Sequence, residues 1–399
     1  LESYGYDALD TDVGTYDAWW WNHPPMYQKK GLYREYCKMV KEVVDIPVFC
    51  AGRMDNPDMA LEAIENGECD VIDLGRPLLA DPDYCNKLRC GKITQIRPCI
   101  SCHEGCMGRV ASYSLLNCAV NPQAARERVN AYEPILKKKK VLIVGGGVAG
   151  CEAARVLAIR GHQPVVYEKG SRLGGNLIPG GAPDFKEDDI ALADWYTNEL
   201  NRLGVHVHLN TELNEEEIKT MDYDTVILAT GSKPKVFSLG DDLHTYTAEQ
   251  VLLKQKDAGK KTVVVGGGLV GCETALWLAQ NGIHVTIVEA LDKVMAVNGP
   301  LCAANKEMLE ALLPFNGVEI ITGAKVTEFA NGEVKVDTKE GSKTIMSDSV
   351  ILSVGYKEEN TLYNNLQFDI PDLYLLGDAK KVSNIMYAIW DAFEVANHI

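Results

Sequence analysis

The sequence lacks the features that mark membrane proteins and nucleic-acid-binding proteins. None of its apolar runs approaches the roughly 18 to 20 residues that a helix needs to cross a bilayer. Positive charge is scarce, because 40 Lys and Arg residues face 56 Asp and Glu residues and the formal net charge is −16. Proteins that bind nucleic acid hold its phosphates mainly through Lys and Arg. We therefore expect neither a membrane nor a nucleic-acid partner.

The beginning of the chain lacks a methionine and the apolar stretch of a signal peptide. Its first residues, LESYGYDALDTDVG, read as the middle of a longer protein. Of the 12 cysteines, four lie together between residues 99 and 118 and the others are scattered. Scattered free thiols are typical of a reducing compartment, where structural disulfides are rare. We therefore expect a cytoplasmic protein.

Two segments, 141–168 and 262–289, repeat one pattern at an offset of 121 residues. Each has an apolar strand, a G-x-G-x-x-G turn, a helical stretch and a second strand that ends in Glu. The first Gly permits a tight turn, the second lets the backbone approach a pyrophosphate, and the third lets the helix pack against the sheet. The glycines are Gly145, Gly147 and Gly150 in the first segment, and Gly266, Gly268 and Gly271 in the second. One copy alone also fits a glycine-rich turn without a ligand, but two copies with matching flanks predict two dinucleotide sites.

Three further stretches are KGSRLGGNL, YDTVILATGSKP and PDLYLLGDAKK. Together with the two repeats, they resemble flavoproteins in which an NAD(P)H domain is inserted into an FAD domain. The resemblance covers residues 141–399 and implies that the first unit binds FAD. Beyond the first fingerprint and Glu168, the FAD contacts that it implies are Gly174, Thr230, Gly231, Gly377 and Asp378. The alternative interpretation of Asp378 is an acid that stabilises a turn.

The second unit would then bind the nicotinamide cofactor. Glu168 and Glu289, at the ends of the two repeats, are placed to accept hydrogen bonds from an adenosine ribose. A carboxylate at Glu289 favours a free 2′-hydroxyl and repels a 2′-phosphate, so NADH is predicted in preference to NADPH. No cysteine occurs between residues 152 and 271, and we expect no dithiol chemistry beside the FAD.

Four cysteines form a compact group, Cys99, Cys102, Cys106 and Cys118, with the spacing C-x2-C-x3-C-x11-C. Three thiolates in a tight loop and a fourth from farther along are how proteins hold a [4Fe–4S] cluster. Structural zinc usually takes two separated cysteine pairs, and disulfides do not suit a reducing compartment, so these are the less favoured alternatives. His103 lies within the group and is interpreted as an exposed loop residue rather than a ligand.

Residues 1–98 read as strands that alternate with helices, which is typical of a parallel sheet. Strands are predicted to end near residue 14, to cover 46–54 and to begin at 71, with a helix over 57–70. Glycine and arginine together at a strand end can cradle a phosphate, and in (β/α)8 barrels the phosphate site follows strands 7 and 8. Two strand ends carry such pairs: Gly52 with Arg53, and Gly75 with Arg76.

The order of motifs along the whole chain resembles the 2,4-dienoyl-CoA reductase and 2-enoate reductase branch of the old yellow enzyme family. The resemblance rests on CAGRM, on NPDMALEAIENGECDVIDLGRPLLADPDYCNKLRCG, on CISCHEGC and on the two repeats that follow. It implies an FMN-binding barrel, a [4Fe–4S] cluster, FAD and NADH. It also implies that Gly52, Arg53, Gly75 and Arg76 bind the FMN.

The predicted fold class is α/β: the C-terminal part of a TIM-type barrel, a cysteine segment, and two Rossmann-like domains, with the NAD domain inserted in the FAD domain. The predicted boundaries are 1–95 for the barrel part, 96–130 for the iron–sulfur segment, 131–240 and 345–399 for the FAD domain, and 241–344 for the NAD(H) domain. A complete barrel takes about 250 residues. Three strands alone leave open sheet edges, so we expect the missing front of the barrel in cis or in trans. We also expect a homo-oligomer.

The resemblance implies NADH-dependent reduction of an activated C=C bond in a 2-enoate, an enoyl-CoA or an enone. Electrons would pass from NADH to FAD, to the cluster, to FMN and to the substrate. Tyr16 is predicted to donate a proton or to orient the substrate carbonyl. Nearby aromatic residues form either an apolar lid or a packing surface. These are Trp19, Trp20, Trp21, His23 and Tyr27. Two alternatives stay open: an amine dehydrogenase of the trimethylamine type, and an NADH-oxidising electron-transfer subunit.

Overall fold

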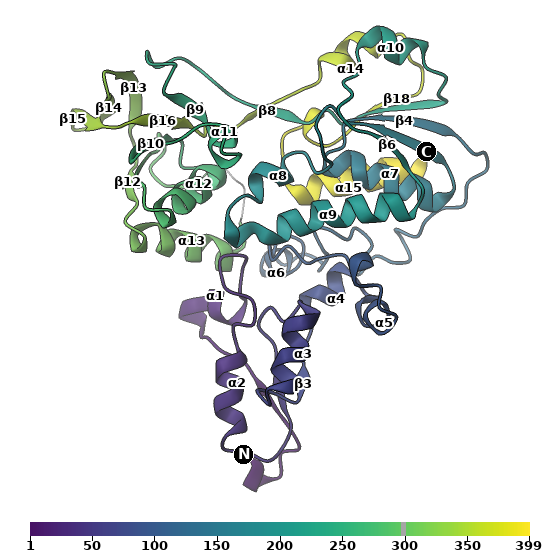
Figure 1. Cartoon of the computed structure of the whole chain (residues 1–399), viewed down its shortest axis with the longest axis vertical. Coiled ribbons are helices and arrows are strands. Elements are labelled where there is room, and N and C mark those ends of the chain that lie inside the picture. Colours follow the sequence, from purple (N-terminus) through teal and green to yellow (C-terminus); the bar gives the residue numbers. More distant parts are fainter. Residues whose placement is uncertain (297–300) are drawn as a thin grey trace.

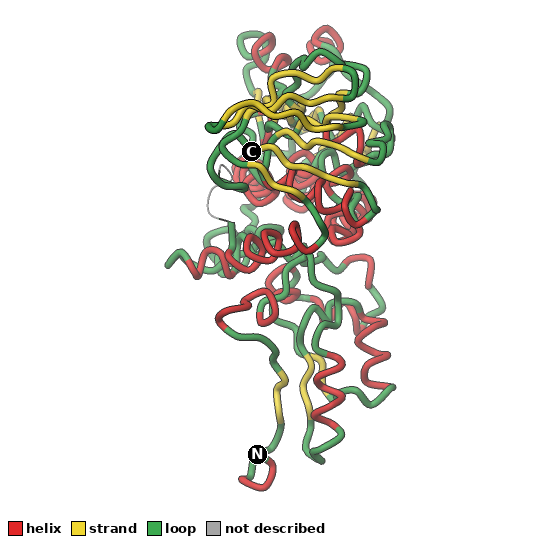
Figure 2. Tube along the Cα trace, turned by 90° about the vertical axis from the view of Figure 1, so that its left-hand side faces the viewer, coloured by secondary structure: helices red, strands yellow, loops and turns green. Residues whose placement is uncertain are grey.

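The computed structural model describes residues 1–296 and 301–399 and has three parts (Figure 1). The N-terminal part forms a narrow stalk, and two lobes lie side by side above it. In the view turned by 90°, helices lie between the strands of the upper part and the stalk (Figure 2). None of the helices described in these two ranges combines the length and the apolar character that a bilayer span requires.

The N-terminal part holds a parallel sheet of three strands in the order β1-β2-β3. The strands are β1 (Leu9–Thr11), β2 (Val48–Cys50) and β3 (Val71–Ile72). The helices are α1 (Trp19–Asn22), α2 (Arg34–Lys41), α3 (Pro57–Glu65), α4 (Arg76–Ala80) and α5 (Tyr84–Arg89), with the 3-10 turns η1 (Glu2–Tyr4), η2 (Tyr16–Ala18) and η3 (Ile93–Gln95). The predicted alternation of strands and helices is confirmed, although β3 is short because the chain soon turns into α4.

Helix α3 begins where its sequence contains preferred capping residues. The Asn56 side chain accepts hydrogen bonds from the backbone N–H groups of Asp58 (2.9 Å) and Met59 (3.1 Å), and Pro57 occupies the first helical position. This helix is the crossover between β2 and β3. Because the two strands are parallel, the loops that follow them lie at the same edge of the sheet, and both predicted Gly-Arg pairs are found there.

Residues 96–124 connect the stalk to the first lobe and contain one short helix, α6 (Met107–Ala111). Ile100 and Val120 are buried in the same apolar core as the sheet and helices of that lobe. Packing therefore fixes this cysteine segment to the first lobe at both ends of the cysteine group.

The first lobe contains a five-stranded parallel sheet in the order β18-β7-β4-β5-β6. Its strands are β4 (Lys140–Val144), β5 (Gln163–Tyr167), β6 (His206–His208), β7 (Thr225–Leu228) and β18 (Leu373–Leu375). Its helices are α7 (Val148–Arg160), α8 (Leu177–Gly180), α9 (Glu187–Arg202), α10 (Glu215–Thr220), α14 (Thr361–Leu366) and α15 (Ile385–His398), with η4 (Asp184–Lys186) and η5 (Gly377–Ala379). The interior strand β7 is buried along its whole length, as expected of a parallel sheet covered by helices.

The second lobe contains a parallel sheet in the order β12-β11-β10-β16-β9 and an antiparallel sheet, β13-β14-β15. Its strands are β9 (Thr245–Thr247), β10 (Lys261–Val265), β11 (His284–Val288), β12 (Glu319–Ile321), β13 (Lys325–Ala330), β14 (Glu333–Thr338), β15 (Gly341–Met346) and β16 (Ser349–Leu352). Its helices are α11 (Ala248–Leu252), α12 (Leu269–Gln280) and α13 (Ala303–Phe315). The predicted end of this lobe at residue 344 is too early, because β16 returns from the hairpin and pairs with β10.

An antiparallel pair of strands, β8 (Ser232–Pro234) and β17 (Tyr356–Glu358), connects the two lobes. The second lobe lies between these strands in the sequence, whereas strands of the first lobe lie on both sides of them. The predicted α/β class is confirmed, with one Rossmann-like unit inserted into the other.

Candidate functional site

The two glycine-rich turns have the same geometry in the two lobes. Gly145 and Gly266 adopt left-handed φ angles of 106° and 103°. A Cβ atom on Gly150 would lie 1.9 Å from the Gly145 carbonyl oxygen, and one on Gly271 would lie 2.0 Å from the Gly266 carbonyl oxygen. Only glycine fits at the third position, because any side chain would push the helix away from the strand.

The glutamate at the end of each repeat accepts a hydrogen bond from the backbone of the glycine-rich turn. Glu168 accepts hydrogen bonds from the backbone N–H groups of Gly146 and Gly170, both at 2.6 Å. Glu289 accepts from the corresponding Gly267 at 2.6 Å and from Leu291 at 2.7 Å. Each carboxylate therefore braces the turn in addition to its predicted contact with a ribose.

Cofactor preference is expected to follow from the charge of Glu289. We expect kcat/KM for NADH to exceed that for NADPH by roughly tenfold or more, because this carboxylate repels a 2′-phosphate. Steady-state kinetics with both cofactors measure the ratio. Asp292→Asn is a matched control, since this neighbouring acid forms an exposed ion pair with Lys339 and should leave the ratio unchanged. A preference for NADPH in the unmodified protein would overturn the assignment.

The other residues predicted to contact FAD lie around the first glycine-rich turn. Gly174 forms a bridge with Gly147, and Thr230 donates a hydrogen bond to the Glu359 carbonyl oxygen at 2.5 Å. Gly231 and Gly377 are also predicted to contact FAD. They adopt left-handed φ angles of 74° and 58°.

Asp378 lies on η5, at the end of the first sheet. Its carboxylate accepts from the Ser232 hydroxyl and the Ser383 backbone N–H, both at 3.0 Å. Burial raises the pKa of this carboxyl above its usual range. Asp378 therefore stabilises a local turn, as in the alternative interpretation, and also lines the cavity described next.

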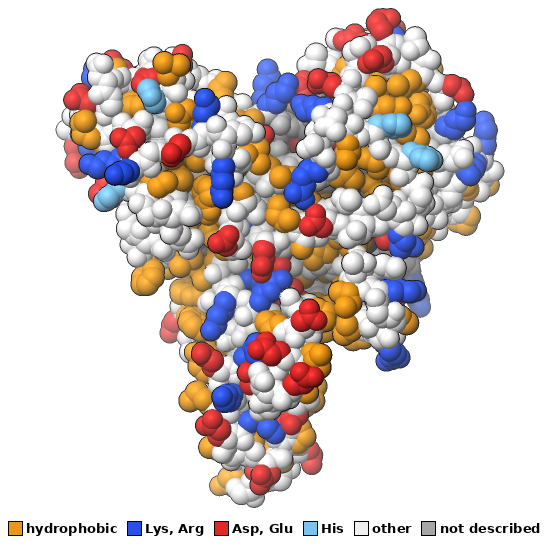
Figure 3. All heavy atoms as spheres, in the orientation of Figure 1, with side chains coloured by type: hydrophobic (Ala, Val, Ile, Leu, Met, Phe, Trp, Pro, Cys, Tyr) orange, Lys and Arg blue, Asp and Glu red, His pale blue; other side chains and the backbone are white. Residues whose placement is uncertain are grey.

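A cavity of 2410 Å³ lies between the two lobes and is lined by residues of both. Figure 3 shows a hollow in the surface at this place. Parts of both fingerprints, both repeat acids and one member of the cysteine group open into it. These residues include Gly147, Glu168, Asp378, Gly268, Glu289 and Cys102. Dinucleotides bound at the two turns would therefore share one space that extends to the cysteine segment.

The four cysteines Cys99, Cys102, Cys106 and Cys118 lie around one small internal cavity. Burial raises the pKa of the Cys99 thiol to about 12 and that of Cys118 to about 11. Thiols in such surroundings stay protonated unless a bound cation offsets the cost of burying their charge. Within residues 1–296 and 301–399, no three metal-ligating side chains are close enough to hold a single metal ion.

His103 is buried, so its interpretation as an exposed loop residue is wrong. Its Nε2 atom lies 2.7 Å from Nη1 of Arg76, and its Nδ1 atom lies 2.6 Å from Oδ1 of Asn305 on α13. Both ring nitrogens are engaged, which leaves His103 without a free atom for metal ligation. Burial and the nearby Arg76 guanidinium hold the pKa of this imidazole well below its usual value.

The two Gly-Arg pairs lie at the carboxyl ends of β2 and β3, where the FMN phosphate was predicted. Both Nη atoms of Arg53 are engaged with protein groups, whereas its buried Nε has no partner among the described residues. Arg76 donates to the Pro24 carbonyl oxygen at 2.9 Å as well as contacting His103. The remaining predicted pair members, Gly52 and Gly75, border these loops, and Gly52 has a left-handed φ of 85°. Nε is thus the nitrogen of the Arg53 guanidinium that has no partner among the described residues.

The aromatic run lies between the N-terminal part and the second lobe. Helix α1, which carries Trp19, Trp20 and Trp21, contacts α13 of that lobe. The Trp19 ring stacks on His23 with centroids 5.4 Å apart. Tyr16 follows β1 and is 90% exposed. These contacts favour the packing interpretation of the tryptophans.

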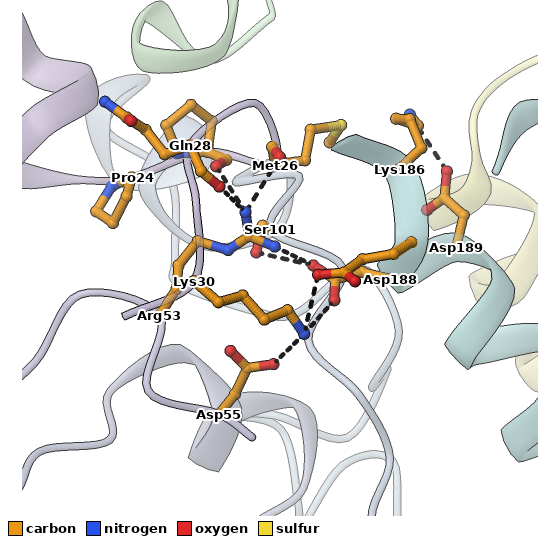
Figure 4. Close-up of polar contacts among 12 residues, drawn as sticks. Pro24, Met26, Gln28, Lys30, Arg53, Asp55, Ser101, Lys186, Asp188 and Asp189 are labelled. Carbon is orange, nitrogen blue, oxygen red and sulfur yellow. Dashed lines mark hydrogen bonds and ion pairs between the residues drawn. The ribbon is translucent and has the colours of Figure 1, made fainter. Parts of the chain in front are cut away.

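A buried polar junction, which no sequence pattern indicates, lies where the three parts meet (Figure 4). Its charged members are Lys30, Arg53, Asp55, Lys186, Asp188, Asp189 and Glu273. The run of charges at 186–189 has the composition of an exposed helix start, and no local pattern distinguishes it from one. Only the burial of Asp188 and Asp189, each no more than 3% exposed, reveals the difference.

Two fingerprints that face one cavity, each with a bracing acid, define a dinucleotide-binding oxidoreductase module. Residues 139–392 match the model for pyridine nucleotide-disulphide oxidoreductases, and residues 11–95 match the model for the NADH:flavin oxidoreductase / NADH oxidase family. The chain belongs to the pyridine nucleotide-disulphide oxidoreductase family, whose model matches more than half of it, and its N-terminal part is similar to the NADH:flavin oxidoreductase / NADH oxidase family, the old yellow enzyme family.

Individual relatives agree with this placement. Cinnamate reductase from Clostridium sporogenes is 50% identical over all of this chain, which covers 60% of that protein. A 2-naphthoyl-CoA reductase complex has a TM-score of 0.92 at 27% identity, over 99% of this chain and 60% of that one. A 6-hydroxypseudooxynicotine amine oxidase from Pseudomonas geniculata has a TM-score of 0.85 at 26% identity, over 98% and 61%. The chain spans about three fifths of the length of each.

Proposed function

We propose that this chain is the NADH-oxidising part of an iron–sulfur flavoenzyme that reduces an activated C=C bond. The observation that carries the proposal is the cavity that is lined by parts of both dinucleotide fingerprints and reaches Cys102. The predicted NADH site is therefore next to the cysteine segment, which leads toward the predicted FMN site.

The residues present fit the four groups that this function requires. The first turn offers FAD an open cradle, since the nearest atom to a Cβ built on Gly147 is 3.9 Å away. Cys99, Cys102, Cys106 and Cys118 supply the all-thiolate donor set of a [4Fe–4S] cluster, and the unpartnered Arg53 Nε matches an FMN phosphate. When bound, these groups would carry electrons from NADH to the substrate.

The protein's own residues would bind the two dinucleotides, orient the substrate and donate a proton to it. The N-termini of α7 and α12 offer backbone N–H groups and the positive end of the helix dipole to the two pyrophosphates. Glu289 would hold the ribose of NADH. Tyr16, which begins η2 after β1, would deliver a proton from its phenol to the α-carbon of the substrate or orient the carbonyl.

The substrate class that we propose is a 2-enoate, with an enoyl-CoA or an enone as further possibilities. Its support is the 50% identity to a cinnamate reductase. The remainder of the barrel, in cis or in trans, would supply most of the substrate pocket. We further propose a cytoplasmic homo-oligomer.

An amine dehydrogenase is the second candidate, because an amine oxidase shares this architecture. The electron donor distinguishes the two. We expect NADH, added under anaerobic conditions, to bleach the bound flavin within the time of manual mixing, because the second fingerprint is intact. A panel of secondary and tertiary amines should leave the flavin oxidised. Bleaching by an amine but not by NADH would contradict the proposed function.

A further inference from the structure

Arg53 and Asp188 form a buried ion pair between the N-terminal part and the first lobe (Figure 4). Nη2 of Arg53 lies 2.6 Å from Oδ2 of Asp188, and both side chains are 3% exposed. Arg53 follows β2 and has a left-handed φ of 61°, whereas Asp188 is in the first turn of α9. Nη1 of Arg53 donates to the carbonyl oxygens of Met26, at 3.1 Å, and Gln28. The guanidinium is therefore held on two sides.

Asp188 also receives groups from two other segments. Lys30 Nζ lies 2.7 Å from Oδ1 of Asp188, and the Ser101 hydroxyl donates to Oδ2 at 3.3 Å. Lys30 in turn lies 3.0 Å from Asp55. A single carboxylate of the first lobe thus ties together the loop after β1, the loop after β2 and the cysteine segment.

The next residue, Asp189, makes its contacts toward the second lobe. It pairs with Lys186 at 3.2 Å, and Lys186 lies 3.4 Å from Glu273 on α12. The Tyr27 hydroxyl donates to Glu273 at 2.7 Å. Of the two neighbouring acids, only Asp189 lines the large cavity. Asp188 is therefore separated from the NADH and FAD sites and faces the predicted phosphate loop.

We propose that Asp188 is a positioning residue for the FMN site. By holding Nη2 in place, it directs the unpartnered Nε of Arg53 and sets where the Gly52-Arg53 loop lies relative to the first lobe. This inference rests on the proposed function. Removing the charge of Asp188 leaves the buried Arg53 guanidinium without its acidic partner, whereas Lys30 keeps Asp55, so the loop that carries Arg53 must shift. FMN binding should weaken, while the FAD site stays as it is.

The test compares Asp188→Asn with the unmodified holoenzyme, including the part that completes its barrel. We expect the Kd of FMN to rise roughly tenfold or more, because the loop that holds its phosphate is displaced. FAD content, iron content and the anaerobic rate of FAD reduction by NADH should stay within about twofold of the native values. These readouts separate a positioning effect from general loss of structure.

Asp194→Asn is the matched control, because Asp194 lies on the same helix and forms an exposed pair with Arg172. It should change none of these quantities. If Asp188→Asn fails to fold, Ser101→Ala, which removes one hydrogen bond to Asp188, should raise the FMN Kd by about threefold. An unchanged FMN Kd, or equal loss of FAD and FMN, overturns the inference. If NADH does not reduce the flavin of the unmodified protein, the proposed function fails, whereas the FMN comparison still decides the role of Asp188.

Discussion

Replacing Cys102 with serine is expected to lower enoate reduction by roughly a hundredfold or more, while NADH still reduces the bound FAD at close to the native rate. Of the four grouped cysteines, Cys102 lines both the small cysteine cavity and the large nucleotide cavity. Serine keeps the shape of the side chain but is a poor ligand for iron. Anaerobic stopped-flow measurement of flavin bleaching, together with product analysis, separates the two steps.

Cys90→Ser is the control for this experiment, because Cys90 is an exposed free thiol outside the group. It should leave both steps and the iron content unchanged. Survival of enoate reduction in Cys102→Ser would contradict the role of the cysteine group. Loss of flavin reduction in the same variant would instead place Cys102 in the structure of the FAD site.

A pair of alanine substitutions in the first fingerprint is expected to have opposite effects on folding and on binding. Gly150→Ala places a Cβ 1.9 Å from the Gly145 carbonyl oxygen, and we expect it to destabilise the apoprotein by about 3 kcal/mol or more. Gly147→Ala meets no protein atom closer than 3.9 Å. It should leave the thermal stability of the apoprotein unchanged but weaken FAD binding by roughly a hundredfold, because the methyl group occupies the place of the pyrophosphate.

Calorimetry of the apoprotein and FAD titration measure these two effects separately. The second fingerprint supplies an internal comparison, since a Cβ on Gly271 would lie 2.0 Å from the Gly266 carbonyl oxygen. Gly271→Ala should therefore destabilise the second lobe. Tight FAD binding by Gly147→Ala would show that FAD does not sit on the first turn.

The glycine fingerprints could be predicted because their chemistry is local. Gly145 and Gly150 must be glycine whatever the rest of the chain does, since one needs a left-handed φ and the other a close helix contact. The same spacing identifies Glu168 and Glu289 as the acids predicted to contact a ribose, whereas their hydrogen bonds to the adjacent turn are seen only in the structure. Spacing along the chain was therefore enough to recognise both units and the insertion of one into the other.

The junction between the parts could not be predicted, because its partners are far apart in the sequence. The place of Arg53 at a strand end predicts a phosphate contact, but nothing near it in the sequence indicates that its guanidinium also meets Asp188, which lies 135 residues later. The burial of His103 could not be predicted either, because its partner Asn305 is 202 residues away. A polar residue in a loop is assumed to face water unless a distant element covers it, and nothing local indicates that element.

The most direct test of the proposed function is a product balance under anaerobic conditions. NADH and an aryl enoate are incubated with the holoenzyme, and the NADH consumed is compared with the saturated acid formed. Reduction of one C=C bond takes the two electrons of one NADH, so the account predicts equal amounts of the two. NADH oxidation without any loss of the enoate would contradict it and would indicate that the electrons leave to another acceptor.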